Sequence, residues 1–538
     1  MLGISSRTIP LGRDVGLGRR RRSSLGRSCW QLFYWFAFPA VLCADQGLAT
    51  LDLERLGAVV SKIQLEKGSK GWSISLDYVR HRPDRWLSKL AELENVVDLS
   101  LRHTPVIDST ITTLTTFPGL SHLRRLDLSH TEVSAVGVGR LSRFAELRDL
   151  SLGRVSFDTE AVKSLYACTA LRTLDLSGTR LRAKDLEGIE ALVHLRRLNV
   201  RATYLGDKGL VYLARLRHLR ELDMSQDSNG PAAVRISDDG LIEFVKRLHA
   251  GSSETSPTQL EVLVVSKNFL GPRGVLEGIS RLKRLKELDI SGNHVGDDGI
   301  RAVLQLKELE SLRVSGPSYS VKALRRISQL KNLRRLMMIN TRVTGDVLRD
   351  YESLSELRVL SLFACFGIGD DALPQIVKLQ KLEELNLGLV RSVSDASAPL
   401  FSKIPALKRL GVGGTSLTDN AVPHLKRLVQ LTHLDLSSTG VTGSGLAGLD
   451  SLQSLRWLNL GDIKLENGDL RVLLQWPQLT TLDLGGTGVS DNVVPYLAQM
   501  TQLRQLGIQP TRISSRARQR LSTSLPQCDY VDSLHLRR

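Results

Sequence analysis

The chain has 538 residues, of which 42% are hydrophobic and 24% are charged, so it has ample apolar material for a folded core. A single globular core stops growing near about 250–300 residues, which leaves either several domains or an array of repeats. The formal charge is +17, but residues 1–44 contribute +6 of it. The remaining +11 over 494 residues is a modest surplus, and nucleic acid is not expected as a partner.

The first 44 residues have the three parts of a secretory signal. A basic stretch ends at Arg27, an apolar run follows over residues 29–44, and Cys43 or Ala44 offers a cleavage point. This run is shorter than the roughly 20 residues that a transmembrane helix needs, so we predict a cleaved signal and no transmembrane span in the mature chain. Because Leu42 is bulky for a cleavage motif, an uncleaved membrane anchor over residues 29–44 stays open.

Residues 45–95 are predicted to form an N-terminal cap. Residues 51–60 have the spacing of a helix start, and Ile63–Leu65 can pair with Ile74–Leu76 as a hairpin across a glycine-containing turn. Such a cap would cover leucines that the first repeat otherwise leaves in water.

From residue 96 to residue 513 the chain repeats the pattern L-x-x-L-x-L-x-x-T-x-V, most often with a period of 24 residues. A fixed period of this size is the signature of a solenoid, in which each unit contacts only its neighbours. Seventeen units begin at Val96, Leu123, Leu147, Leu171, Leu195, Leu219, Leu260, Leu285, Leu309, Leu333, Leu357, Leu382, Leu407, Leu431, Leu455, Leu479 and Leu503.

Each unit is predicted to contain one short strand and one short helix. Leu174 and Leu176 alternate with polar residues, as in a strand with one buried face. Apolar residues over 493–500 recur at helical spacing, with Ser490 or Asp491 placed to cap the helix. One unit buries too little apolar surface to fold alone, so strands must pair in parallel from unit to unit while the helices pack on the other side.

Two polar columns of the repeat are predicted to be structural. The residue after each strand is mostly threonine, whose hydroxyl can bond the backbone of the turn. Aspartates at the helix starts are predicted to cap the helices rather than to bind metal. The threonines are Thr104, Thr131, Thr179, Thr203, Thr341, Thr415, Thr439, Thr487 and Thr511, and the aspartates are Asp207, Asp238, Asp297, Asp370 and Asp419.

One unit departs from the period. Leu219 and Leu260 lie 41 residues apart, 17 more than in a standard unit, and comparison with the preceding unit places the extra residues in 226–235 and 249–257. Insertions in a repeat form loops, often on a binding edge, and a tolerated surface insertion is the alternative.

The middle residue of most strands is polar or small, but this character changes between residues 313 and 363. Adjacent strands there would gather four apolar side chains beside two arginines in one exposed patch on the concave face. Such patches mark partner sites, and aromatic residues and arginines are favoured anchors; drift of the repeat consensus is the alternative. The predicted partner-binding residues are Arg313, Arg335, Met337, Ile339, Val359, Ser361 and Phe363.

Residues 514–538 are predicted to form a C-terminal cap and tail, with a closing helix over Ser514–Leu525. Beyond the signal only Cys168, Cys365 and Cys528 remain, six or more repeats apart. A disulfide needs Cα atoms within about 7 Å, so we predict small, buried, apolar cysteines instead.

From about Leu51 to Val531 the chain resembles the leucine-rich-repeat superfamily. Leu431–Leu446 is similar to the 24-residue, threonine-type units of bacterial exported proteins, and Leu360–Leu373 resembles one unit of the cysteine-containing class. The resemblance implies an α/β horseshoe-shaped solenoid of about 17 repeats, with parallel strands on the concave face and helices on the convex face. It also implies an interaction role without naming a ligand.

Catalytic motifs are absent from the sequence, which has no P-loop, no H-E-x-x-H and no G-x-S-x-G. His103 and His130 occupy ordinary repeat positions. We therefore predict a non-enzymatic scaffold that binds another protein or an extracellular ligand, without cofactor or metal. The signal predicts export to the periplasm, the cell surface or the medium; a cytoplasmic regulatory or substrate-recognition scaffold is the alternative.

Overall fold

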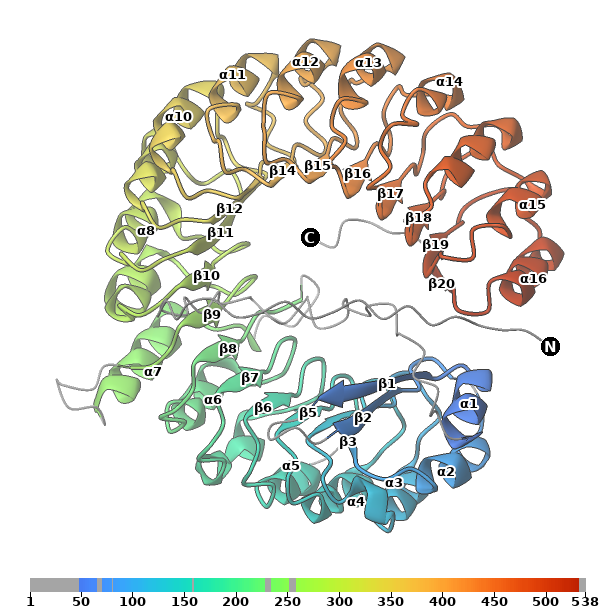
Figure 1. Cartoon of the computed structure of the whole chain (residues 1–538). Coiled ribbons are helices and arrows are strands. Elements are labelled where there is room, and N and C mark those ends of the chain that lie inside the picture. Colours follow the sequence, from blue (N-terminus) through green and yellow to red (C-terminus); the bar gives the residue numbers. More distant parts are fainter. Residues whose placement is uncertain are drawn as a thin grey trace, which may run out of the picture. The chain divides into compact units, whose positions relative to one another are not determined.

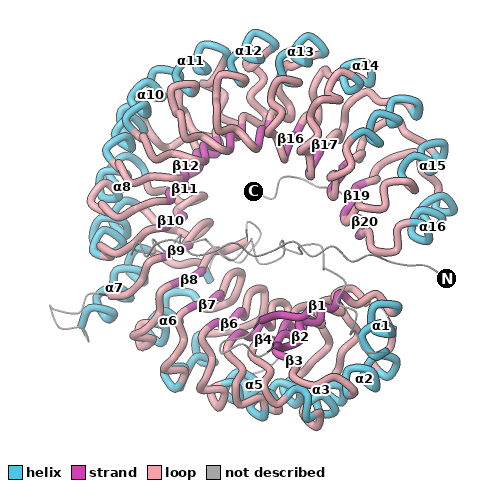
Figure 2. The backbone as a smooth tube through the Cα atoms, in the orientation of Figure 1, coloured by secondary structure: helices cyan, strands magenta, loops and turns pink. Residues whose placement is uncertain are grey.

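The computed structural model describes residues 48–64, 70–79, 81–156, 159–227, 234–250 and 258–531. These residues form one curved array of strand-and-helix repeats (Figure 1). The strands lie along the concave side and the helices along the convex side, with loops joining the two layers (Figure 2). The fold is the predicted α/β solenoid. The predicted signal over residues 1–44 lies outside the described residues.

The array begins with two helices and an intervening hairpin. Its elements are α1 (Leu48–Arg55), β1 (Val59–Gln64), β2 (Lys70–Ser75) and α2 (Asp84–Ala91). The hairpin strands are antiparallel, with Val59 opposite Ser75, and β2 then pairs in parallel with β3. Leu53 of α1 and Trp86 of α2 are fully buried, so this segment covers the apolar end of the first repeat. The turn over residues 65–69 lies outside the described residues.

Seventeen strands, β3 to β19, follow in chain order, and each pairs in parallel with the next. There is one strand for each predicted repeat, which confirms the repeat register. Their bounds are β3 (Val96–Ser100), β4 (Arg125–Asp127), β5 (Asp149–Ser151), β6 (Thr173–Asp175), β7 (Arg197–Asn199), β8 (Glu221–Asp223), β9 (Val262–Val264), β10 (Glu287–Asp289), β11 (Ser311–Ser315), β12 (Arg335–Ile339), β13 (Val359–Ser361), β14 (Glu384–Asn386), β15 (Arg409–Gly411), β16 (His433–Asp435), β17 (Trp457–Asn459), β18 (Thr481–Asp483) and β19 (Gln505–Gly507).

The core runs between the strand layer and the helix layer. The central leucine of each short strand lies opposite its counterpart in the next strand, as Leu150 lies opposite Leu126 and Leu174. These three leucines are each 1% exposed. Full burial of one such side chain stabilises the fold by about 1.5–3 kcal/mol, and here the burial depends on both neighbouring repeats.

Short helices cover the convex side (Figure 2). Those after α2 are α3 (Asp108–Leu114), α4 (Ala135–Gly139), α5 (Thr159–Leu165), α6 (Gly206–Leu213), α7 (Asp238–Ala250), α8 (Gly296–Val303), α9 (Val321–Arg326), α10 (Gly345–Asp350), α11 (Leu373–Ile376), α12 (Ala398–Phe401), α13 (Val422–Leu425), α14 (Gly443–Ala447), α15 (Val494–Leu497) and α16 (Ser515–Ser524). Across the part of the chain that the structure describes, none of the helices combines the length and the apolar character that a membrane crossing requires.

The helix-start aspartates lie in the first turns of their helices, as predicted, but they hydrogen-bond to the next repeat, which corrects the predicted capping. The Asp419 carboxylate accepts hydrogen bonds from the Thr442 backbone N–H at 2.8 Å and from the Thr442 hydroxyl at 2.6 Å. The same two bonds join Asp207 to Ser237, Asp297 to Ser320 and Asp370 to Ser394, whereas Asp238 accepts one bond from the Gly271 N–H. Because a carboxylate makes strong hydrogen bonds, these pairs link adjacent repeats on the convex side.

The threonine column is structural, as predicted. The Thr179 hydroxyl donates to the Leu176 carbonyl at 2.6 Å, and the Thr487 hydroxyl donates to the Leu484 carbonyl at the same distance. At Asn293 the side-chain amide instead donates to backbone carbonyls of its own repeat and of the preceding one. The polar residue after each strand therefore satisfies the backbone where the chain turns away from the sheet.

The long unit keeps the sheet register despite its extra residues. Strands β8 and β9 pair directly, with Leu222 opposite Leu263. Helix α7 has 13 residues, more than any other helix that the structure describes. Most of the two predicted insertions, residues 228–233 and 251–257, lies outside the described residues.

The C-terminal end of the array is closed by α16 and a last strand, β20 (Asp529–Val531), which pairs in parallel with β19. The three cysteines are buried and free. Burial raises the pKa of the Cys168 thiol to about 11 and that of Cys528 to about 12. Their thiols are therefore protonated at neutral pH, in line with the predicted packing role.

Candidate interaction surface on the concave face

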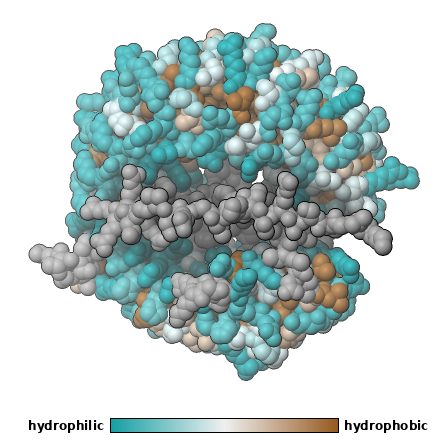
Figure 3. Space-filling model, viewed as in Figure 1, coloured by the Kyte–Doolittle hydropathy of each residue, from teal (hydrophilic) through white to brown (hydrophobic). Residues whose placement is uncertain are grey.

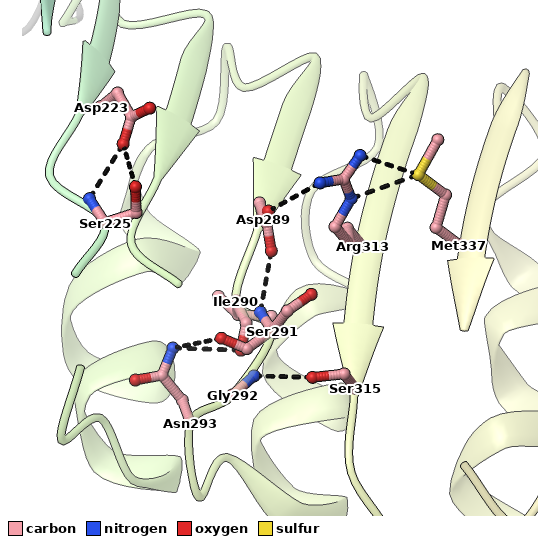
Figure 4. A network of polar contacts seen from close by, with 10 residues as sticks. All are labelled: Asp223, Ser225, Asp289, Ile290, Ser291, Gly292, Asn293, Arg313, Ser315 and Met337. Atoms are coloured by element: carbon pink, nitrogen blue, oxygen red, sulfur yellow. Dashed lines mark hydrogen bonds and ion pairs between the residues drawn. The ribbon is translucent and has the colours of Figure 1, made fainter. Parts of the chain in front are cut away.

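The candidate site lies on the concave face where β10 to β13 run side by side, and Arg313 of β11 is at its centre (Figure 4). The Arg313 guanidinium donates two hydrogen bonds to the Met337 sulfur, at 2.9 and 3.2 Å, and forms an ion pair of 3.5 Å with Asp289 on the preceding strand. Its side chain is only 27% exposed. The charged group is thus held between two neighbouring strands.

Aspartates at the last position of the strands are tied to the turn that follows. The Asp289 carboxylate accepts a hydrogen bond from the Ser291 N–H at 2.9 Å, and burial raises the pKa of Asp289 despite the nearby Arg313 charge. Asp223 accepts from the N–H and the hydroxyl of Ser225, and burial raises its pKa to about 6. Turn formation explains these aspartates, and no cluster of three or more His, Cys, Asp or Glu side chains suited to a metal is found within the described ranges.

Three predicted site residues share one face of β12. Arg335, Met337 and Ile339 alternate along the strand, and each is half-buried. Leu336 and Met338, which lie between them, are fully buried in the core. Alternation along the strand therefore presents one positive charge and two apolar side chains to the concave side.

Two predicted residues are not exposed, which corrects the expectation of an open apolar patch. Val359 lies between Arg335 and Glu384 on the adjacent strands and is 7% exposed. Ser361 lies between the longer Met337 and Asn386 on the adjacent strands and is 8% exposed. Strands about 4.8 Å apart allow long side chains to cover short neighbours, so Val359 and Ser361 support the surface without forming it.

Phe363, just after β13, is half-buried. A Cβ atom at Gly388 would lie 2.9 Å from a ring carbon of Phe363, so the ring lies against this glycine of the next repeat. The accessible part of the predicted site therefore has five members, which we name the central patch: Arg313, Arg335, Met337, Ile339 and Phe363.

Family models match two parts of the array. A model for a leucine-rich-repeat region matches residues 270–485, which include the whole central patch, and a second leucine-rich-repeat model matches residues 119–142. The chain belongs to the leucine-rich-repeat superfamily. Proteins of this superfamily typically serve as interaction scaffolds. No curated protein matches the chain.

Solved leucine-rich-repeat structures resemble the chain at low identity. An internalin from Listeria monocytogenes is 19% identical with a TM-score of 0.37, and the match covers 70% of this chain and 89% of the internalin. A leucine-rich-repeat protein of Leptospira interrogans is 18% identical with a TM-score of 0.36, covering 85% and 94% of the two chains. The yeast Rad7–Elc1 complex matches at 19% identity and a TM-score of 0.47, covering 69% and 87%. At this identity the likeness concerns the fold alone.

One feature of this leucine-rich-repeat array was missed from the sequence. The rings of Tyr78 and His103 stack with centroids 4.6 Å apart, and those of His103 and His130 stack at 3.8 Å. Burial lowers the pKa of both histidines, to about 4 for His130, so their rings are neutral at pH 7. The signal in the sequence was a ring-bearing residue three positions after each of three successive strands, β2, β3 and β4.

Hydrophobic residues on the face seen in Figure 3 gather over the arc that carries α11 to α13. Two shallow hollows lie on the convex side, one lined by α14 and residues 468–475 and the other by α15 and α16. Neither hollow includes a residue of the central patch.

Proposed function

We propose that this leucine-rich-repeat protein is a non-enzymatic scaffold that binds a protein partner through the central patch. The observation that carries the proposal is the position of Arg313, which is held between Asp289 and Met337 with a largely covered side chain. Binding through such a group loses little side-chain entropy, because the arginine is already ordered. Apolar and aromatic side chains beside an ordered arginine are the usual composition of an interface hot spot.

The extent of the central patch favours a macromolecule over a small ligand, because its residues lie on or just after three adjacent strands, β11 to β13. Small molecules bind in concave pockets that bury most of their surface. The two shallow hollows described above lie on the convex side, lined by helices and away from the central patch. A protein or peptide segment that spans β11 to β13 could contact Arg313, Met337 and Phe363 together.

The test compares Phe363→Ala with Phe366→Ala. Phe366 is a matched control because it is 68% exposed, lies three residues away and is outside the central patch. The full chain serves as bait, and captured proteins are quantified by mass spectrometry while the melting temperature of each variant is recorded. We expect Phe363→Ala and Arg335→Ala to lose a partner that Phe366→Ala retains, with all melting temperatures unchanged. Equal capture by the two phenylalanine variants would contradict the proposal.

We also propose that the protein is exported, on the strength of the basic and apolar segments before residue 45. The intact mass of the protein purified from its source cells tests this proposal. A mature chain that begins near residue 45 is the expected result. A full-length chain in the cytoplasm would instead support a cytoplasmic regulatory or substrate-recognition scaffold, and a full-length chain in the membrane fraction would support an anchor over residues 29–44.

A further inference from the structure

A row of arginines lies along the first half of the array, and their side chains have no ion-pair partner among the residues that the structure describes. The residue immediately before each strand stacks on its counterpart in the next repeat, because the backbone N–H of one donates to the carbonyl of the other. The Arg172 N–H donates to the Arg148 carbonyl at 2.7 Å, and the Arg196 N–H donates to the Arg172 carbonyl at 2.8 Å. We name Arg148, Arg172 and Arg196 the arginine row; they directly precede β5, β6 and β7.

The arginine row carries three uncompensated charges. Among the residues that the structure describes, none provides an ion-pair partner for any of the three arginines. The basic residues at both ends of the row are paired, Arg124 with Glu146 at 3.3 Å and Arg220 with Glu261 at 3.7 Å. Arg172 and Arg196 are exposed, and Arg148 is half-buried.

The same position is occupied differently from β9 to β15. There, glutamates are interspersed among the basic residues that precede the strands, and each of these basic residues pairs with a glutamate of a neighbouring repeat. Lys286 pairs with Glu261 at 3.0 Å, and Arg334 pairs with Glu310 at 3.6 Å. Glu383 pairs with both of its neighbours, Arg358 and Lys408, the latter at 3.1 Å. A glutamate before a strand can therefore neutralise the basic residue before the next strand. At the arginine row these positions hold arginine instead.

Neighbouring like charges in a sheet destabilise it, and strand spacing sets these arginines only about 4.8 Å apart at the backbone. An external anion that bridges the row would relieve this repulsion. Guanidinium groups present planar forks of N–H donors, which match carboxylates with two parallel hydrogen bonds. The row thus has the chemistry to bind several carboxylates in line.

We propose that the arginine row docks an extended acidic segment of a partner protein. Alternate side chains of an extended peptide lie about 6.6–6.8 Å apart on one face, a spacing that flexible arginine side chains can meet. Single-stranded nucleic acid is disfavoured because its binding sites add aromatic side chains on which bases stack. The segments around the row, 147–151, 171–175 and 195–199, contain no aromatic residue. This surface is separate from the central patch, so each can be tested while the other is intact.

The test uses the full chain and a fluorescent peptide of six Glu-Ser repeats, with binding followed by anisotropy at low salt. Arg148→Gln, Arg172→Gln and Arg196→Gln combined are expected to weaken binding by at least about tenfold. The matched control combines Arg334→Gln, Arg358→Gln and Lys408→Gln, which removes the same charge from the same column where it is already paired. This control is expected to bind within about twofold of the wild type.

Three results would overturn the proposal. Equal losses in the two triple variants would assign binding to net charge alone. Tighter binding of a single-stranded oligonucleotide or of heparin than of the peptide, at the same salt, would assign the row to another polyanion. Should the triple variant fail to fold by urea titration, Arg172→Gln alone is the test; it is expected to weaken binding by about threefold, and an unchanged affinity would contradict the proposal.

Discussion

Two stretches of the array, β5 to β7 and β10 to β15, differ in the residue that precedes each strand. Between β5 and β7 that residue is arginine in three successive repeats, and none of the three has an ion-pair partner among the described residues. Between β10 and β15 basic residues and glutamates share this position; Glu310 pairs with Arg334, and Glu383 pairs with Arg358 and Lys408. The backbone hydrogen bonds of the column are alike in both halves. The fold therefore determines the stacking, while the sequence of each repeat determines whether the stacked charges are balanced.

Aspartates at the last position of two strands also differ in the residues opposite them. Asp289 has Arg313 opposite it on the next strand. Asp223, in the first half, lies between Asn199 and Val264, neither of which carries a charge. Burial raises the pKa of both carboxyls, to about 6 for Asp223. Burial therefore raises the pKa of a strand-end aspartate whether or not a charged residue lies opposite it.

The largest predicted effect is at Asp223. Its pKa is raised from 3.8 to about 6, so the folded carboxyl keeps its proton between these pH values while the unfolded one loses it. Stability therefore falls as the pH rises through this window. Asp223→Asn keeps the acceptor for the Ser225 N–H, as Asn199 and Asn459 show in their own repeats. We expect it to raise the free energy of unfolding by up to about 3 kcal/mol at pH 7 and to change little below pH 4.

Urea titration at pH 4 and pH 7 checks the Asp223 prediction. A variant that is less stable than the wild type at pH 7 would show that the charged carboxylate stabilises the fold, and it would contradict the prediction.

An intermediate effect is predicted for Arg172→Glu, which gives the first half the charge pattern of the second. The new carboxylate would stand between Arg148 and Arg196, as Glu383 stands between Arg358 and Lys408. We expect binding of the Glu-Ser peptide to fall by more than about tenfold and the free energy of unfolding to rise by about 0.5 kcal/mol. Anisotropy measures the change in binding, and urea titration measures the change in stability. A variant that keeps full peptide affinity would contradict the claim that the unpaired arginines bind the peptide.

The smallest effect is predicted for Glu383→Gln, which gives the second half the pattern of the first. Burial alone would raise the pKa of Glu383, but hydrogen bonds from Lys408 and Arg358 outweigh it and lower the pKa. The charged carboxylate therefore stabilises the fold above its unfolded pKa, and this contribution is lost as the pH falls through the lowered value. Because these side chains are partly exposed, Glu383→Gln should cost only about 0.5–1 kcal/mol at pH 7.

Acidification provides the control for Glu383→Gln. In urea titrations the difference between wild type and variant should shrink as the pH falls below the unfolded pKa of a glutamate; a difference that does not change with pH would come from packing and not from charge.

The repeat register was predictable because it depends on spacing within one unit. Each strand from β4 to β19 begins two residues after the leucine that opens its predicted repeat, and the threonine hydroxyls make the expected turn bonds. The aspartate bonds were not predictable in this way. Asp419 reaches Thr442 in the next repeat, and spacing within one helix suggests capping instead.

The candidate site was predictable only in part, since exposure depends on the neighbouring strands. Arg313 and Met337 were expected to lie together and do contact each other. Val359 was expected to be exposed and is covered, because its neighbours are the longer Arg335 and Glu384. The arginine row was visible in the sequence as arginines 24 residues apart, but its lack of partners required the side-chain positions.

The most direct test of the account is to build a second arginine row. Glu383→Arg would place an unpaired arginine between Arg358 and Lys408, with urea titration to verify that the variant folds. Isothermal titration with the Glu-Ser peptide then counts the sites. Two peptides per chain, against one for the wild type, is the predicted result. A folded Glu383→Arg variant that still binds one peptide would contradict the claim that unpaired, stacked arginines are what make the binding surface.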